Sequence, residues 1–84
     1  MKHELKCTPD YFFEILEGYK NIEIRFNDRN FQTGYVITLK EYKKETDTYT
    51  GSEILIKVWS VKEFEGLKTG YVLLYFDKIA SYNV

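Results

Sequence analysis

The sequence predicts a mainly β protein of the α+β class, in which a small mixed sheet of five or six strands curls into a barrel beside one helix. A length of 84 residues allows one domain, so residues 1–84 are assigned to a single unit. One strand pattern is followed by a helix pattern and then by further strand patterns. Strands and helices therefore do not alternate as they do in doubly wound parallel sheets. Tyrosine, the most frequent aromatic residue here, suits half-buried positions in a sheet.

The first two elements are a short strand and a capped helix. In the segment "KHELKC", residues 2–7, Lys and Glu alternate with other residues, which predicts a strand with His3, Leu5 and Cys7 on one face. Thr8 then stands at the N-cap, Pro9 at the first helical position and Gly18 at the C-terminal stop. We expect a helix over about residues 9–17. Its apolar stripe is expected to contain Tyr11, Phe12, Ile15, Leu16 and Tyr19.

The rest of the chain is expected to form strands separated by polar loops. The connection "KKETDTYTG" reads as a hairpin, in which Asp47 or a neighbour takes a turn conformation and Gly51 a bulge. The last strand is apolar on both faces, which predicts a central or buried place in the sheet. Trp59 is expected to be a packing residue. The four strands are expected at residues 20–26, 35–42, 52–61 and 71–79.

Composition and charge exclude several classes of protein. The formal net charge is −1, so the chain is not a generally basic nucleic-acid coat, and any binding of RNA has to come from a local patch. The two arginines of the chain, Arg25 and Arg29, lie four residues apart. No apolar run approaches the length of a membrane span, and the N-terminus lacks the apolar region of a signal peptide.

Cysteine and histidine use predicts neither a disulfide nor a metal site. Cys7 is the single cysteine, which fits a reducing compartment, and we expect a cytoplasmic protein without a cofactor. One histidine, His3, and one cysteine do not make a zinc cluster. The two lie roughly 13 Å apart along one strand, so a catalytic Cys–His pair is disfavoured and a buried thiol is the simpler expectation.

The strongest candidate site is a charged cluster that begins in "GYKNIEIR", residues 18–25. On a strand, Glu23 and Arg25 point to one face, and a turn at the preceding glycine brings Lys20 beside them. Arg29 follows on the adjoining loop. Arginine offers a planar fork for phosphate or a base edge, lysine a point charge, and glutamate an orienting group or an acceptor.

A structural explanation of the same cluster stays open. Glu23 and Arg25 could instead form cross-strand ion pairs with neighbours such as Glu53 or Lys57, each contributing roughly 0.2–1 kcal/mol. The nearby aromatic residues have two readings as well. They could frame a pocket in which bases stack, or they could be core residues. These aromatic residues are Tyr11, Phe12, Phe31 and Tyr35.

The segment "GYKNIEIR" follows the pattern Gly-x-Lys-x-x-Glu-x-Arg and resembles the signature of the ASCH (activating signal cointegrator homology) domain of the PUA-like superfamily. The resemblance covers essentially the whole chain. It is closest to a small bacterial and phage family of uncharacterised ASCH-like proteins. The segments that carry it, in order, are "HELKC", "PDYFFEIL", "IRFNDRNFQTG", "YTG" and "FEGLKTGYVLL".

The resemblance implies a PUA-like pseudo-barrel of five or six strands, with a polar cleft between the helix and the sheet. It also implies that RNA or a modified nucleotide binds there, whereas the residues themselves predict no membrane span and no metal site. The residues expected to bind the ligand are Lys20, Glu23, Arg25, Arg29, His3, Lys6 and Asp28. Tyr11 and Phe31 are the residues expected to stack against a base.

Two other functions stay open. Some compact ASCH proteins resemble amidohydrolases that remove acyl groups from modified cytidine, and others resemble ribonucleases. The amidohydrolase type uses the signature lysine, a threonine three residues later and a carboxylate from an inserted helix. This chain has Glu23 in place of that threonine, and its loop "KEFEGLKTG" is too short for the helix. If the protein is an enzyme, Lys20 and Glu23 are the expected acid–base pair. The third possibility is a protein-interaction module.

Overall fold

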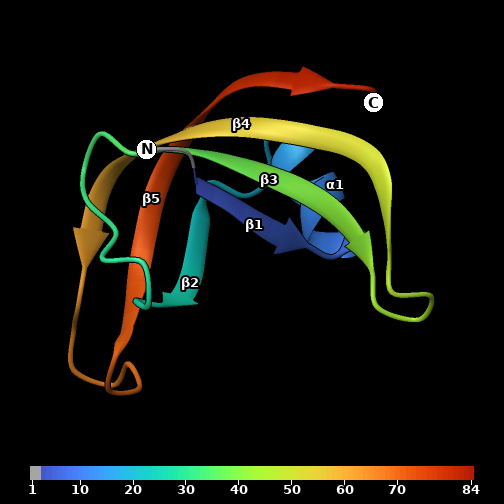
Figure 1. Cartoon of the computed structure of the whole chain (residues 1–84). Helices are drawn as coiled ribbons and strands as arrows, with labels where there is room; N and C mark the ends of the chain where they lie inside the picture. The colour runs from blue at the N-terminus through green and yellow to red at the C-terminus, as the bar shows by residue number, and fades with distance from the viewer. Residues whose placement is uncertain (1–2) are drawn as a thin grey trace.

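The computed structural model describes residues 3–84 and has one mixed sheet of five strands, curled into a half-barrel, with a single helix (Figure 1). The predicted mainly β class is confirmed, and the arrangement is consistent with a PUA-like pseudo-barrel. The strands lie in the order β1-β3-β4-β5-β2. The elements are β1 (His3–Cys7), α1 (Pro9–Leu16), β2 (Ile22–Phe26), β3 (Val36–Lys43), β4 (Thr48–Lys62) and β5 (Tyr71–Tyr82).

The two strands nearest to the N-terminus form the two edges of the sheet. β1 pairs with β3 in parallel, and all other neighbours are antiparallel. β2 pairs with β5 rather than with its neighbours in the sequence, and Figure 1 shows it beside the red ribbon of β5. β5 therefore lies between β4 and β2, which confirms the interior position predicted for the last strand.

The helix ends where the sequence predicts. Gly18 adopts φ +83°, a conformation that residues with a Cβ atom rarely adopt, and the chain reverses there. Its N–H donates to the carbonyl of Ile15 at 3.1 Å, while the N–H of Tyr19 donates to the carbonyl of Glu14 at 2.8 Å. This pair of bonds is a Schellman motif, which satisfies two carbonyls that the helix itself cannot.

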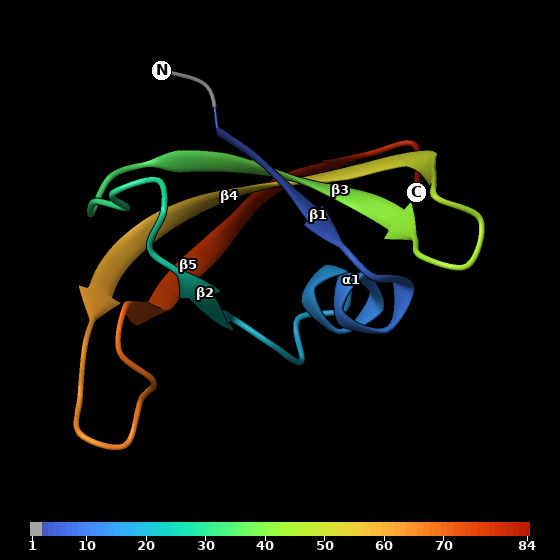
Figure 2. The same ribbon diagram turned by 60° about the horizontal axis from the view of Figure 1, so that its bottom comes forward.

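The predicted apolar stripe of α1 is wrong in part. Phe12 and Ile15 are buried and Leu16 packs against them, but Tyr11 is exposed and Tyr19 is 74% exposed. A helix of only two turns presents a narrow face to the sheet, and Tyr19 lies beyond its reversal. Figure 2 shows α1 on one side of the curved sheet, under the strands.

The core lies on the inner face of the sheet. In the parts of β3, β4 and β5 that cover the core, every second residue is buried and apolar. β1 buries His3, Leu5 and Cys7 on the same face, as its sequence predicts. The buried apolar side chains are Leu5, Cys7, Phe12, Ile15, Phe31, Ile37, Leu39, Ile54, Ile56, Val58, Val72, Leu74 and Phe76.

The hairpin between β3 and β4 is tighter than expected. Its connection spans residues 44–47 instead of 43–51, because the β-branched start of β4 continues the ladder. Asp47 takes φ +52° in the turn, and its carboxylate accepts a hydrogen bond from the Tyr42 hydroxyl. Gly51 lies at φ +94° beside a register shift, so the predicted bulge is confirmed.

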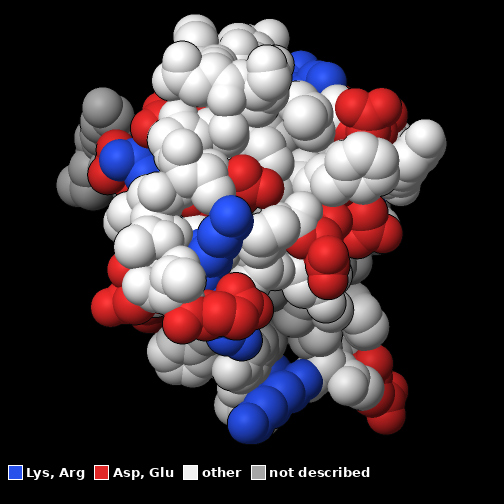
Figure 3. All heavy atoms as spheres, turned by 90° about the vertical axis from the view of Figure 1, so that its right-hand side faces the viewer, with Lys and Arg blue, Asp and Glu red and all other residues white. Residues whose placement is uncertain are grey.

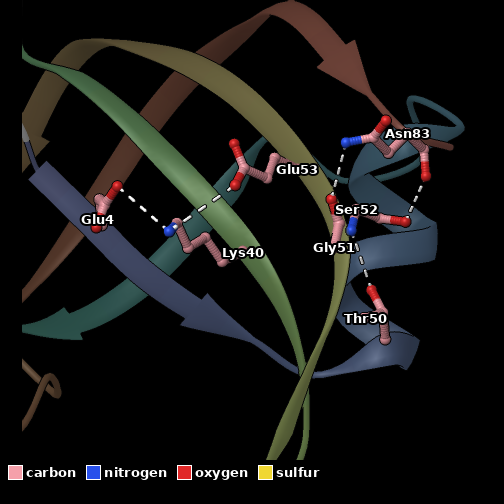
Figure 4. A network of polar contacts seen from close by, with 7 residues as sticks. All are labelled: Glu4, Lys40, Thr50, Gly51, Ser52, Glu53 and Asn83. Carbon is pink, nitrogen blue, oxygen red and sulfur yellow. Dashed lines mark hydrogen bonds and ion pairs between the residues drawn. The ribbon is translucent and has the colours of Figure 1, made fainter.

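The C-terminal end of β5 is tied to the start of β4. Ser52 Oγ donates to the carbonyl of Asn83 at 2.6 Å, and Asn83 Nδ2 donates to the carbonyl of Gly51 at 3.2 Å (Figure 4). β5 thereby runs to Tyr82, beyond the predicted end at residue 79. Antiparallel pairing holds these two strands together along most of their length.

Candidate functional site

The charged residues of β2 point into the molecule, and its apolar residues point out. Glu23 is 8% exposed, whereas Ile24 is 55% exposed. The cause is the register with β5, in which Glu23 lies opposite the fully buried Leu74. A carboxylate at such a position needs partners, because a charge loses hydration when it is buried.

The partners of Glu23 come from its own segment. Lys20 Nζ lies 3.8 Å from Oε1, and Arg25 Nη2 lies 3.7 Å from Oε2. Both contacts are ion pairs that exceed hydrogen-bonding distance. Oε2 is buried and has no hydrogen-bond donor in the structure. Lys20, Glu23 and Arg25 therefore form one cluster, whose carboxylate keeps unused acceptor capacity.

The alternative of cross-strand ion pairs with β4 is wrong. β2 adjoins β5, so its side chains do not lie opposite those of β4. Glu53 pairs instead with Lys40, at 3.8 Å, and Lys57 lies opposite Asp77 of β5. The order of strands in the sheet, which local patterns do not specify, decides these partners.

Arg25 also closes the barrel. The edges of β1 and β2 face each other without a shared ladder, and we call this gap the seam. Arg25 Nη2 donates to the carbonyl of Lys6 across it, at 2.7 Å. A hydrogen bond from a charged donor is stronger than one between neutral groups, and here it takes the place of backbone pairing.

A hollow of about 570 Å³ opens on one side of this bridge. Phe26, Phe31 and Tyr49 contribute rings to its wall. Its charged side chains comprise four cations and two carboxylates, which leaves a surplus of two positive charges (4 − 2). They are Lys6, Arg25, Arg29, Lys40, Glu4 and Asp28.

A second hollow of about 380 Å³ lies on the other side of Arg25. Tyr11, Cys7 and Glu23 line it together with Lys6 and Arg25, which both hollows share. We call the two hollows together the seam groove. Burial, reinforced by the negative charge of Glu23, raises the pKa of the Cys7 thiol to about 12. The thiol is therefore neutral and a poor nucleophile at neutral pH.

Cations and rings alternate where the groove meets the β3–β4 hairpin. Lys6 Nζ lies 4.4 Å from the ring centre of Tyr42, and the rings of Tyr42 and Tyr49 are 5.4 Å apart. Lys40 Nζ lies 5.8 Å from the Tyr49 ring and bridges Glu4 and Glu53 (Figure 4). Figure 3 shows positive and negative side chains interspersed on the face that carries this hairpin.

The structure brings most of the predicted site residues together. Lys6, Arg25, Asp28, Arg29 and Phe31 line the first hollow, although the Phe31 ring is largely buried. Tyr11 and Glu23 line the second hollow. Lys20 adjoins it, with Nζ 3.9 Å from the ring centre of Tyr11 and paired with Glu23.

His3 lies apart from this group. Its side chain is buried and stacks on Tyr35, with ring centres 4.3 Å apart, and Nε2 has no hydrogen-bond partner. Neither hollow of the seam groove includes it. Sequence reasoning missed Lys40 and Tyr49, which come from β3 and β4. Only the pairing of distant strands brings them to the groove.

The described part of the chain offers no cluster of three or more His, Cys, Asp or Glu side chains that could hold a metal ion. Over the same residues, no helix has the length and apolar character needed to cross a membrane.

Comparison with known proteins places the chain in a family. Residues 2–76 match the family described as "Domain of unknown function (DUF3850)". The chain is also 33% identical, over 73 residues, to the "Uncharacterized 12.9 kDa protein in GpA 3'region" of Escherichia phage P2. That alignment covers 87% of this chain and 65% of the phage protein, so the chain spans about two thirds of its relative's length. The matched residues include the signature, the helix and most of the sheet, and the chain belongs to the DUF3850 family.

Proposed function

We propose that this protein is an RNA-binding module of the ASCH type, with RNA or a modified nucleotide held in the seam groove. The observation that carries the proposal is the set of four cations around the first hollow, next to a buried carboxylate that has unused acceptor capacity. The ASCH-like signature supports it, because its lysine, glutamate and arginine form the cluster at this groove.

The cations divide into two kinds by their surroundings. Arg25 is committed to the seam through its bond to the Lys6 carbonyl, so it fixes the shape of the groove. Arg29 and Lys40 line the same hollow from two different elements, one from the loop after β2 and the other from β3. For a phosphate in this hollow, Arg29 can supply a planar fork and Lys40 a point charge.

The aromatic and acidic groups give the groove a means to hold a base. Tyr49 is exposed at the wall of the first hollow, where a planar ring can stack on it. Glu23 can accept a hydrogen bond from an amino group of a base that enters the second hollow. Phosphate contacts then position the ligand, while base contacts select it.

Binding through so few cations should be weak and only moderately dependent on salt. With two or three phosphate contacts, the slope of log K against log [salt] for a single strand is expected between about −1.4 and −2.1, since each contact adds about −0.7. A net charge of −1 adds no general attraction for a polyanion.

The test is an amide chemical-shift titration by NMR at low salt, with short single-stranded RNA and then with modified nucleosides. Shifts are expected along β1, over residues 18–31 and at Lys40. The double variant Arg29→Ala, Lys40→Ala should weaken binding at least about ten-fold, because it removes two of the four cations that line the first hollow. The matched control is Lys43→Ala, Lys44→Ala, which removes the same charge from the exposed hairpin.

Silence at millimolar ligand would overturn the proposal. Equal losses in the two double variants would also contradict it, because they would show that only overall charge matters. Arg25 is left unchanged in this comparison, since its substitution alters the seam itself.

A further inference from the structure

We propose that a single strand of RNA leaves the seam groove and continues over the outer face of β2, β5 and β4, where its bases stack on the aromatic rings of that face. The inference rests on the proposed function and extends it from a nucleotide to a polynucleotide ligand. We call this surface the aromatic face. Its members are Phe26, Tyr71, Tyr75 and Trp59, with Ile24 and Leu73 between them.

The strand register places these side chains on one surface. Phe26 lies opposite Tyr71, and Ile24 lies opposite Leu73, so all four share the face that points away from the core. On the other side of β5, a bulge between Val58 and Ser60 adds one residue to β4. That extra residue is Trp59. Because it follows the buried Val58, Trp59 points to the outer face, where its ring contacts that of Tyr75.

The rings form two pairs. Those of Phe26 and Tyr71 have centres 5.5 Å apart, and those of Trp59 and Tyr75 have centres 5.2 Å apart. Tyr71 and Tyr75 are four residues apart on one strand, which separates the pairs by roughly 14 Å. This is several times the ~3.4 Å rise of one stacked nucleotide, so one nucleotide cannot engage both pairs.

Two of the four rings are exposed, and those of Tyr71 and Tyr75 are partly buried. Phe26 is 53% exposed and Trp59 is 50% exposed, although each is large and apolar. Gly70 leaves room for the Phe26 ring, because a Cβ at that position would lie 2.8 Å from Phe26 Cε1. The loop before β5 therefore holds this ring in place while its outer side stays open to solvent.

Two features favour a polynucleotide over an apolar protein surface as the occupant. The first is continuity: Phe26 lines both hollows of the seam groove, and Tyr71 lines the second. The second is charge: Lys68 Nζ lies 5.7 Å from the Tyr71 ring, and Lys62 lies opposite Leu73 on the same face. Rings interleaved with lysines are the composition of surfaces that bind single strands.

Trp59 is the single tryptophan of the chain, so its fluorescence reports on this face alone. The experiment titrates the intact protein with RNA of increasing length, from a mononucleotide to about ten nucleotides. NMR shifts report the groove, and tryptophan emission reports the aromatic face. We expect the mononucleotide to shift only groove amides, whereas longer RNA also quenches Trp59 and binds at least ten-fold more tightly.

Tyr75→Ala tests the same point without relying on emission. This substitution should weaken the binding of the longer RNA by about ten-fold and leave the affinity for the mononucleotide unchanged, because it removes one stacking ring outside the groove. Tyr82→Ala is the matched control, since Tyr82 is an exposed tyrosine at the far end of the same strand, seven residues beyond Tyr75.

The outcomes separate the two proposals. If all lengths bind equally and Trp59 emission stays constant, the extension is wrong and the groove proposal stands. If no length binds, the proposed function fails as well. If Trp59 emission changes with protein concentration in the absence of RNA, and sedimentation shows a dimer, a second copy covers the aromatic face and the inference is overturned.

Discussion

Two sides of the same half-barrel are built on opposite principles. Along β3, β4 and β5, the inward residues are apolar and each strand is held by ladders on both sides. At the seam, β2 turns Glu23 and Arg25 inward, and a side-chain hydrogen bond spans the gap to β1. The first side accounts for the stability of the protein. The second side places charges where hydrophobic groups would pack better, and such departures from a consistent design mark candidate sites.

The largest expected effect concerns the Cys7 thiol, which lies at the boundary of the two sides. Its pKa of about 12, against an ordinary value of 9.0, lowers the thiolate fraction near pH 8 by about 1000-fold. Labelling by iodoacetamide, followed by mass spectrometry, should be slower than in urea-unfolded protein by about that factor. Comparable rates in the two states would show that the seam stands open to solvent.

The raised pKa also fixes the direction of a pH effect. The folded state favours the neutral thiol, so this contribution to stability is fully present below about pH 9. It is lost as the pH rises from 9 towards 12, where the unfolded chain ionises first. Cys7→Ser should flatten that alkaline decline in the free energy of unfolding.

The side formed by β3, β4 and β5 is tested by Leu74→Ala. Leu74 is fully buried on β5, and its truncation should cost about 3 kcal/mol of the free energy of unfolding, within the ~2–5 kcal/mol range for such changes. Leu73→Ala is the control, because its side chain lies on the outer face of the same strand. Urea unfolding measures both. A loss at residue 74 no larger than that at residue 73 would contradict the assignment of the core.

The seam should respond less, and in a different way. Arg25→Ala removes the charged bond to the Lys6 carbonyl and one partner of Glu23, at a cost of about 1.5–3 kcal/mol. Adding Glu23→Gln to this variant should recover part of the loss, because the buried charge is then gone as well. Thermal unfolding of the three proteins tests this. Additive losses would mean that Glu23 and Arg25 are not coupled.

The smallest effect is expected on the outer surface of the seam. Lys40 bridges Glu4 and Glu53 at 3.4 and 3.8 Å, but these groups are all partly exposed. Lys40→Ala should lower the free energy of unfolding by less than about 1 kcal/mol. Urea unfolding at low and high salt should show the difference shrinking as salt screens the pairs. A cost as large as that of Arg25→Ala would contradict the distinction between the inner and outer charges.

Much of the fold can be predicted because its signals are local. Pro9 and Gly18 define the helix through backbone preferences that operate within a few residues. The alternation in β4 correctly places Ile54, Ile56 and Val58 on one buried face. Apolar character on both faces of the last strand correctly predicts its interior position in the sheet.

The orientation of β2 could not be predicted in the same way. Alternation shows that Ile24 and Glu23 lie on opposite faces, but it does not show which face is buried. The register with β5, some fifty residues away, decides that Glu23 points inward. For the same reason, its expected ion pairs with β4 were wrong. Trp59, expected to be a packing residue, is half-exposed, because it follows the buried Val58 on β4 and so lies on the outer face of the sheet.

The pairing of β2 with β5 has a consequence for how the chain folds as it is synthesised. β2 gains its ladder only after residues 71–75 have left the ribosome. Lys78 Nζ, which donates to the Leu16 carbonyl at the end of α1 at 2.7 Å, arrives later still. β2 therefore pairs only when the last third of the chain is available, and contacts so distant in sequence slow folding. During that interval, Ile24 and Phe26 lie on an unpaired strand, and such a strand can pair with another chain and aggregate.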